Sequence, residues 1–127
     1  MDNFVESPFP TDLVYYKMKD YFNVEDRQGM LDHFYNDFNK RYFAGFCGVL
    51  AELTIKNQDQ LAKWVFAEAG RKLAHHVIAI QKHIPAEMKL EPGGIKVIII
   101  GSVWKSWPLM REPFLKGKSL PKVLSLR

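Results

Sequence analysis

The segment 95–100 constrains the fold of this chain more than any other part of the sequence. It is rich in β-branched residues, lies between Gly94 and Gly101, and contains four consecutive apolar residues at 97–100. A short apolar run between turn residues predicts a strand buried on both faces, as in the middle of a parallel sheet. Such a strand needs neighbouring strands on either side of it.

Helical patterns make up most of the rest of the chain. Thr11 is a candidate N-cap, and Asn57 begins a sequence typical of a capping box. We expect helices over residues 11–21, 25–37, 44–56 and 58–84, and a last helix that starts near Ser106 or Trp107 because Pro108 fits a first helical turn. The apolar stripe of the second of these helices consists of Met30, Leu31, Phe34, Tyr35 and Phe38.

Gly70 stands in the middle of the longest predicted helix, where a glycine costs up to about 1 kcal/mol of helix propensity. We therefore expect that a neighbouring helix crosses close to this position. The face of this helix expected to be buried consists of Leu61, Trp64, Val65, Leu73, Val77, Ile80 and Ile84.

The predicted fold class is mostly α-helical with one central-type strand. Helices around a lone strand do not make a closed α/β domain. Either the strand joins a sheet supplied by sequence outside this chain, or the chain oligomerises through the unpaired edges of the strand. We favour the first interpretation.

The net charge of the chain is confined to its end. The chain holds 18 Lys and Arg against 14 Asp and Glu, a net charge of +4. The last 12 residues contain Lys116, Lys118, Lys122 and Arg127 and no acid, so residues 1–115 are charge-balanced. A balanced body with a short basic tail weakens a nucleic-acid hypothesis. We expect neither a nucleic-acid nor a membrane partner.

Other sequence features indicate a soluble cytoplasmic protein. A hydrophobic content of 47% is ordinary for a globular chain, and Cys47 is the only cysteine, which excludes an internal disulfide. The apolar run 97–100 is far shorter than the roughly 20 residues that span a bilayer. The N-terminus lacks the pattern of a signal peptide.

The best candidate site follows the predicted strand. Ligands of α/β folds bind beyond the carboxyl ends of strands, where Gly101 would let a ligand approach the backbone. Ser102 and Ser106 add hydroxyl groups beside the start of a helix. The alternative is an ordinary turn and helix cap, which short motifs of this kind more often are.

A second candidate is the small-residue pair Ala44 and Gly45, between Phe43 and Phe46. It suits a flat ring lying against the backbone. The alternative is helix packing with both phenylalanines in the core, which is favoured by the sequence alone.

Three further patterns carry no site. His75, His76 and His83 do not have the spacing of a metal site. The sequence 117–119 lacks the first glycine of a P-loop, and Cys47 lies on an apolar helix face where a thiol is usually inert. We expect no catalytic residue and no metal ligand in this chain.

Two aromatic-rich motifs carry a family resemblance. They are Gly101-Ser102-Val103-Trp104-Lys105-Ser106-Trp107 and, earlier in the chain, Arg41-Tyr42-Phe43-Ala44-Gly45-Phe46-Cys47. With segments 21–27 and 31–38 they resemble eukaryotic N-acetylglucosamine kinases, which belong to the hexokinase–actin–chaperone superfamily. The similarity covers about residues 1–115.

The resemblance implies a fold, an activity and a set of ligands. The fold is the α/β actin-like (ribonuclease H-like) ATPase domain, and the activity is ATP-dependent phosphorylation of N-acetylglucosamine at its 6-hydroxyl. Positions matching Ala44, Ser102 and Ser106 contact ATP, and Mg²⁺ is expected with the nucleotide. Residues 1–115 would be part of the C-terminal kinase domain, and residues 116–127 a divergent basic tail.

The resemblance also implies what this chain lacks. The glycine-rich phosphate-binding hairpin, the catalytic aspartate and the sugar-binding loops of the family are not in this sequence. We therefore expect that the chain alone is inactive. The alternative is a truncated, inactive form that acts as a helical interaction module, with a homodimer as one outcome.

Overall fold

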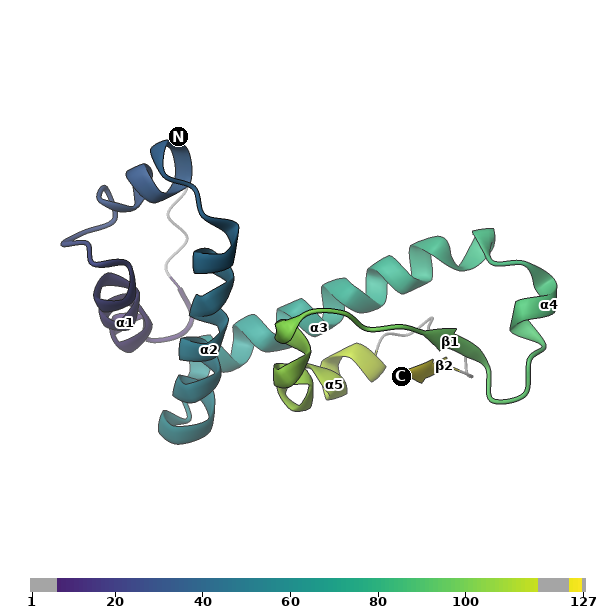
Figure 1. Cartoon of the computed structure of the whole chain (residues 1–127). Helices are drawn as coiled ribbons and strands as arrows, with labels where there is room; N and C mark the ends of the chain where they lie inside the picture. The colour runs from purple at the N-terminus through teal and green to yellow at the C-terminus, as the bar shows by residue number, and fades with distance from the viewer. Residues whose placement is uncertain (1–6, 117–123, 127) are drawn as a thin grey trace. The chain divides into compact units, whose positions relative to one another are not determined.

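The computed structural model of the chain describes residues 7–116 and 124–126, and of the last three only the backbone. The described residues are mostly helical, as expected (Figure 1). They fall into two compact units, one ending at Trp64 and the other beginning at Val65. Each unit is described by itself below. None of the described helices combines the length and apolar character needed to cross a bilayer.

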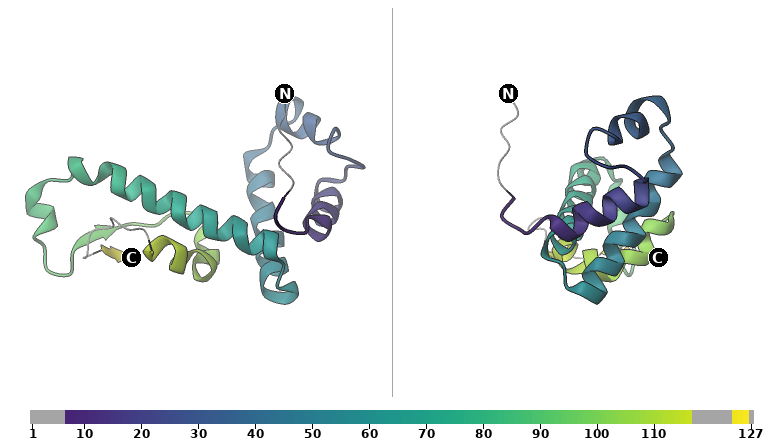
Figure 2. Two further views of the ribbon diagram at one scale, coloured as in Figure 1. Left: turned by 180° about the vertical axis from the view of Figure 1, so that it is seen from behind. Right: turned by 90° about the vertical axis from the view of Figure 1, so that its left-hand side faces the viewer.

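The first unit is built on helices α1 and α2, which lie side by side (Figure 2). Helix α1 spans Asp12–Phe22 and confirms the prediction over 11–21. Helix α2 spans Lys40–Asn57 and begins four residues before the predicted start, because Asn39 caps it. The Asn39 side-chain oxygen accepts from the Tyr42 backbone N–H at 3.0 Å.

The predicted helix over 25–37 is only partly correct, because residues 30–36 are helical and residues 25–29 are not. This segment forms turns and a five-residue π-helical turn, η1 (Asp32–Asn36). Local side-chain bonds compete with a regular helix here, since Asp26 accepts from the Gly29 N–H and Asn36 donates to Asp32. Of the predicted apolar stripe only Met30 is buried, so tertiary packing adds little to a helix. The exposed members of the stripe are Leu31, Phe34, Tyr35 and Phe38.

The predicted capping box at Asn57 is displaced by two residues. Helix α2 includes Asn57 and ends where Gln58 adopts a left-handed conformation with φ 53°. Asp59 then caps helix α3 (Gln60–Ile80) by accepting from the Ala62 N–H at 2.8 Å. Helix α3 continues into the 3₁₀ turn η2 (Gln81–His83) before Pro85.

The buried face of α3 also differs from the predicted one. Trp64 and Ile80 are exposed, and the fully buried positions carry small residues or phenylalanine at intervals of four. Large apolar residues were expected to mark the buried face, but close helix packing favours small ones at the contact. The buried positions of α3 are Ala62, Phe66, Gly70 and Ala74.

The second unit packs α3 against helix α5 (Trp107–Leu115). A Cβ atom at Gly70 would overlap the Met110 carbonyl oxygen and lie 3.3 Å from the Phe114 nitrogen. The predicted close crossing at Gly70 is therefore confirmed, with α5 as the neighbour. Met110 and Phe114 are buried on the α5 side. Between α3 and α5 lie the short helix α4 (Ala86–Lys89) and a turn closed by the Gly94 N–H and the Glu91 carbonyl.

The strand expected over 95–100 is shorter and more exposed than predicted. Strand β1 spans Ile95–Val97 and pairs in parallel with β2 (Leu124–Leu126), with Ile95 opposite Leu124. Ile95 is buried, but Ile98 and Ile100 are 80% and 85% exposed. Burial on both faces is therefore wrong. It requires covering layers and strands on both sides, which this two-stranded pair does not provide within the described residues.

Of the basic tail, Lys116 is described and pairs with Glu112 at 2.8 Å. Lys118, Lys122 and Arg127 lie outside the described residues, as does the sequence 117–119 that was considered as a P-loop.

Candidate functional site

The candidate site after the strand is a glycine turn at the start of a 3₁₀ helix. The turn precedes η3 (Ser102–Ser106), and Gly101 has φ 111° and ψ 156°. This region of backbone conformation is accessible essentially only to glycine. No described heavy atom outside its chain neighbours lies within 4 Å of the position that a Cβ of Gly101 would take. The backbone at this turn is therefore open to approach from outside.

The two serines of the candidate site differ in accessibility. Ser102 is exposed at the start of η3, beside Gly101. Ser106 is buried at the N-cap of α5, which begins at Trp107 with Pro108 in its first turn, as predicted. We refer to Gly101 and Ser102 as the Gly101 turn. It presents one exposed hydroxyl and a stretch of backbone that no described side chain covers at Gly101.

Aromatic contacts hold this turn in place on α5. The rings of Trp104 and Trp107 lie 5.5 Å apart, and Trp107 meets Phe114 edge to face at 5.3 Å. Because Phe114 is buried, these rings fix η3 to the core of the second unit. The Gly101 turn is thus carried on a packed element.

Ala44 and Gly45 lie in the first unit, near the start of α2. Ala44 is exposed, and its predicted contact with ATP stays a prediction. The space above Gly45 is filled by the Tyr21 hydroxyl, with the ring carbon that bears it 3.5 Å from where a Cβ would stand. The hydroxyl end of the Tyr21 side chain therefore occupies the space directly above Gly45.

Tyr21 and Tyr42 join α1 to α2 by exchanging hydrogen bonds. The Tyr21 hydroxyl donates to the Tyr42 carbonyl at 2.7 Å, and the Tyr42 hydroxyl donates to the Tyr21 carbonyl. Their rings stack with centroids 4.9 Å apart and planes 18° from parallel. No local sequence signal could have predicted this pair, because its members lie 21 positions apart.

Gly45→Ala is expected to destabilise the chain by about 1 kcal/mol, because the overlap of the new methyl group with the hydrogen-bonded Tyr21 hydroxyl outweighs the helix propensity that alanine adds. Tyr21→Phe alone should cost about 0.5–1.5 kcal/mol for one lost hydrogen bond. In the double variant the hydroxyl is gone, so the methyl group fits and the cost should not exceed that of Tyr21→Phe. Urea unfolding of the unchanged chain, the two single variants and the double variant measures the coupling energy between positions 21 and 45. Free-energy costs of the single variants that simply add in the double variant would contradict this geometry.

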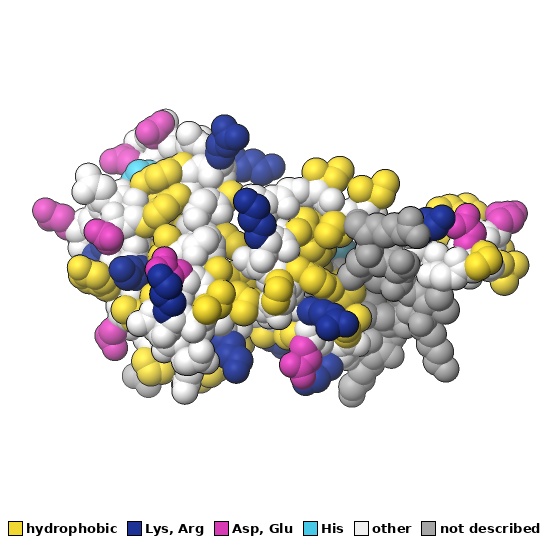
Figure 3. All heavy atoms as spheres, turned by 60° about the horizontal axis from the view of Figure 1, so that its bottom comes forward, with side chains coloured by type: hydrophobic (Ala, Val, Ile, Leu, Met, Phe, Trp, Pro, Cys, Tyr) yellow, Lys and Arg dark blue, Asp and Glu magenta, His cyan; other side chains and the backbone are white. Residues whose placement is uncertain are grey.

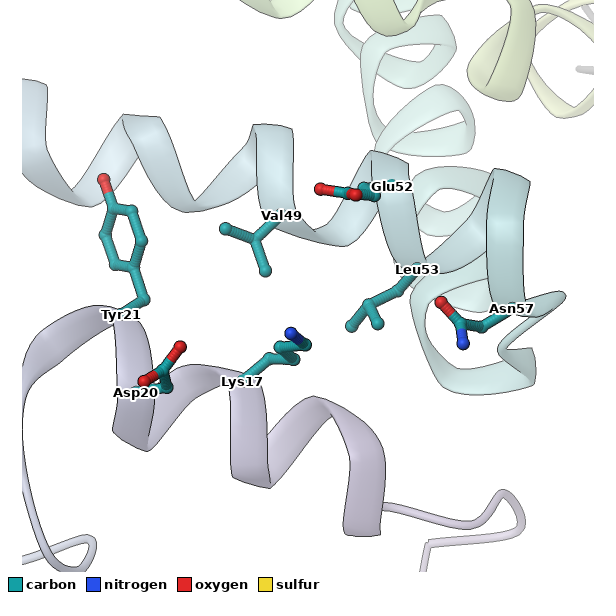
Figure 4. A pocket seen from close by; sticks show the side chains of 7 residues that line it. All are labelled: Lys17, Asp20, Tyr21, Val49, Glu52, Leu53 and Asn57. Carbon is teal, nitrogen blue, oxygen red and sulfur yellow. The ribbon is translucent and has the colours of Figure 1, made fainter.

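A pocket of about 180 Å³ opens between α1 and α2 (Figure 4). Glu52 lies on its rim and accepts a hydrogen bond of 2.6 Å from Lys56. This hydrogen bond and the positive charge of Lys56 lower the pKa of the Glu52 carboxyl, and the charge of Lys17 lowers it by a smaller amount. Sequence reasoning missed the pocket because its residues come from two helices and form no motif. They are Lys17, Asp20, Tyr21, Val49, Glu52, Leu53 and Asn57.

The pocket does not present a catalytic arrangement. The Glu52 carboxylate is engaged by Lys56, and the floor is formed by apolar side chains such as Leu53. Among the described residues, no group of three or more His, Cys, Asp or Glu side chains is placed to hold a metal ion. His76, considered in a metal site, instead has its Nδ1 atom 2.7 Å from the Lys72 carbonyl oxygen. Cys47 is half-buried in α2.

The predicted nucleotide contacts are divided between the two units. Ser102 and Ser106 share η3 in the second unit, and Ala44 lies on α2 in the first. A search against models of known protein families finds no match to this chain.

Proposed function

We propose that this chain is part of an N-acetylglucosamine kinase and that the Gly101 turn forms part of the ATP site. The sequence support is the pair of motifs at 41–47 and 101–107. The kinase transfers the terminal phosphate of ATP to the 6-hydroxyl of the sugar. The actin-like ATPase fold and a cytoplasmic location are part of the same proposal.

The backbone of Gly101 is the observation that carries the proposal. Its φ of 111° would be strained for any other residue, and no described atom packs where a side chain would stand. Internal packing therefore gives no reason for a glycine at this position. The backbone conformation alone accounts for the glycine, and the open space beside it also leaves room for a ligand to approach the backbone closely. The exposed Ser102 hydroxyl supplies a hydrogen-bonding group at the same place.

The chain supplies binding groups but no base for the reaction. Phosphorylation of a sugar hydroxyl needs a base within hydrogen-bond reach of the proton. Neither the Gly101 turn nor Ala44 offers one. We expect that the purified chain transfers no phosphate to N-acetylglucosamine. Mg²⁺ would enter with the phosphates of ATP and would neutralise part of their charge.

Gly101→Ala is expected to weaken ATP binding by about tenfold or more, because the methyl group closes the open backbone. Isothermal titration calorimetry of the full chain with Mg²⁺ and ATP measures this change. Gly93→Ala is the matched control: Gly93 also has a positive φ, of 85°, and open space around it, but lies in the turn before β1. The control should bind ATP like the unchanged chain.

Two results would contradict the proposed site. One is an unchanged chain that binds no ATP. The other is equal weakening by Gly101→Ala and Gly93→Ala, since backbone strain alone would then explain the loss.

The second candidate function is an interaction module. Ile98 and Ile100 are the observation that favours it, since both are almost fully exposed. Hydrophobic side chains are also visible among charged ones over the face shown in Figure 3. Exposed β-branched side chains next to a strand favour association with another polypeptide.

A further inference from the structure

The pocket between α1 and α2 has an apolar floor and a charged rim (Figure 4). Leu53 forms the floor and is only 2% exposed, and the half-buried Val49 lies one turn away on the same helix. Asp20 and Glu52 are exposed on the rim, and Lys17 reaches into the space between the two helices. The pocket therefore becomes more polar from its floor to its mouth.

Two opposite charges on this rim are not paired with each other or with any other described residue. Among the described side chains, neither Lys17 nor Asp20 makes a hydrogen bond or an ion pair. The Glu52 carboxylate, in contrast, is bonded to Lys56. The Asn57 carboxamide, which can both donate and accept, is also unengaged within the described part of the chain. The pocket thus offers one cationic, one anionic and one neutral polar group to a ligand.

We propose that this pocket binds a free aliphatic amino acid, such as leucine, in its zwitterionic form. The α-carboxylate of the ligand pairs with the Lys17 ammonium, and its α-ammonium pairs with the Asp20 carboxylate. The aliphatic side chain packs on Val49 and Leu53, and the Asn57 carboxamide hydrogen-bonds to the charged end. The proposal is independent of the proposed kinase function.

The charges of the rim favour a zwitterion over a ligand with one charge. A simple anion would meet the carboxylates of Asp20 and Glu52, and a simple cation would meet the Lys17 ammonium. The hydrogen bond and charge of Lys56 lower the pKa of the Glu52 carboxyl, so this group is ionised at neutral pH. Electrostatic complementarity at such a rim requires both signs of charge in the ligand.

The volume of the pocket, about 180 Å³, sets the size of the ligand. An apolar cavity of about 150 Å³ takes up benzene, and pockets for drug-sized ligands begin at about 300 Å³. An aliphatic amino acid is slightly larger than benzene and fits this range, whereas a nucleotide is too large.

One wall of the pocket is already fixed before a ligand enters. Tyr21 lines the pocket, and its hydroxyl donates to the Tyr42 carbonyl at 2.7 Å. The ring also stacks on that of Tyr42. A wall held in this way lowers the entropy that binding must remove.

Titration of the isotope-labelled full chain with L-leucine, followed by NMR chemical shifts, tests the site. We expect a dissociation constant of about 1 mM, because each exposed charge pair contributes little. The signals that move should belong to residues lining the pocket, and those of the second unit should stay in place. Isocaproate and isoamylamine share the aliphatic tail but carry one charge each, and each should bind about tenfold or more weakly than leucine.

Two variants test the charged groups separately. Lys17→Met removes the ammonium and keeps most of the stem, so it should weaken leucine binding about tenfold without weakening that of isoamylamine. Asp20→Asn should weaken leucine binding to a similar extent without weakening that of isocaproate. Lys19→Met is the matched control, since Lys19 is also half-buried on α1 but lies over the Tyr15 ring, outside the pocket. The control should bind leucine like the unchanged chain.

Four results would overturn the proposal. The first is an unchanged chain that binds no leucine, and the second is leucine that shifts only signals outside the pocket. The third is isocaproate or isoamylamine binding as tightly as leucine, since only one charge would then be recognised. The fourth is equal weakening by Lys17→Met and Lys19→Met, which would show that net charge and not contact with Lys17 sets the affinity.

Discussion

Gly70→Val is expected to destabilise the second unit by about 3 kcal/mol, at the upper end of what overpacking costs. Any Cβ at this position overlaps the Met110 carbonyl oxygen, and a branched side chain adds further overlap. The obstacle is backbone within α5, so no side-chain rotation relieves it. This cost exceeds the few tenths of a kcal/mol by which valine is more favourable than glycine in a helix.

Gly48→Val is the matched control for this prediction. Gly48 is also a glycine in a helix interior, on α2. Apart from its chain neighbours and the backbone of its own helix, no described heavy atom lies within 4 Å of the position that a Cβ would take. The substitution should change stability by less than about 0.5 kcal/mol. Urea unfolding followed by tryptophan fluorescence suits the measurement, since Trp104 and Trp107 report on the α5 region.

Equal unfolding midpoints for the Gly70 and Gly48 variants would show that α3 and α5 do not pack closely. The unfolding midpoint of Gly70→Ala should lie between those of the unchanged chain and Gly70→Val. Such grading would indicate that steric overlap, and not the loss of glycine flexibility, sets the cost.

Phe22→Ala is expected to cost about 3–5 kcal/mol, the range for removing a buried phenylalanine. Phe22 is 3% exposed at the end of α1. Its ring meets four aromatic side chains and also His33; the nearest are Tyr21 and Phe43, each with its centroid 4.9 Å away. A loss of this size is comparable to much of the stability of a small domain, about 5–15 kcal/mol.

The control for Phe22 is Phe34→Ala. Phe34 also contacts Phe43, at 5.1 Å, but is 51% exposed. Its truncation removes less buried area and should cost less than about 1 kcal/mol. Circular dichroism during thermal unfolding compares the two variants. If both lower the melting temperature equally, the core of the first unit is not centred on Phe22.

Local signals predicted some elements of the fold well. Helix α1 begins directly after the predicted cap position, although the Thr11 side chain makes no capping hydrogen bond there. The start of α5 follows from a proline, a feature that acts within one helical turn. Gly70 predicted a close crossing because a glycine in a helix needs a packing reason. Such features depend on nearby residues and are therefore readable from the sequence.

The failures of sequence reasoning concern tertiary context. The stripe from Met30 to Phe38 has helical spacing, but little of it is buried, so a helix gains little there. The run 95–100 has the composition of a central strand, but in the part of the chain that the structure describes only β2 pairs with it. Burial depends on what surrounds a segment, which its own residues do not specify.

The candidate site was predicted in part. The position of the turn at Gly101 and Ser102 followed from a strand, a glycine and a helix start in order. The burial of Ser106 and the filling of the space above Gly45 by Tyr21 did not, because both depend on contacts between distant residues. The pocket between α1 and α2 has no sequence signal for the same reason.

The exchange of hydrogen bonds between Tyr21 and Tyr42 also makes substitutions at positions 21, 42 and 45 depend on one another. A phenylalanine at position 21 or 42 removes the hydroxyl donor of one of these hydrogen bonds, and a side chain at position 45 excludes the Tyr21 hydroxyl. A change at one of the three positions therefore alters which residues are acceptable at the other two. In related chains these positions should vary together, as a single inherited unit spread over two helices.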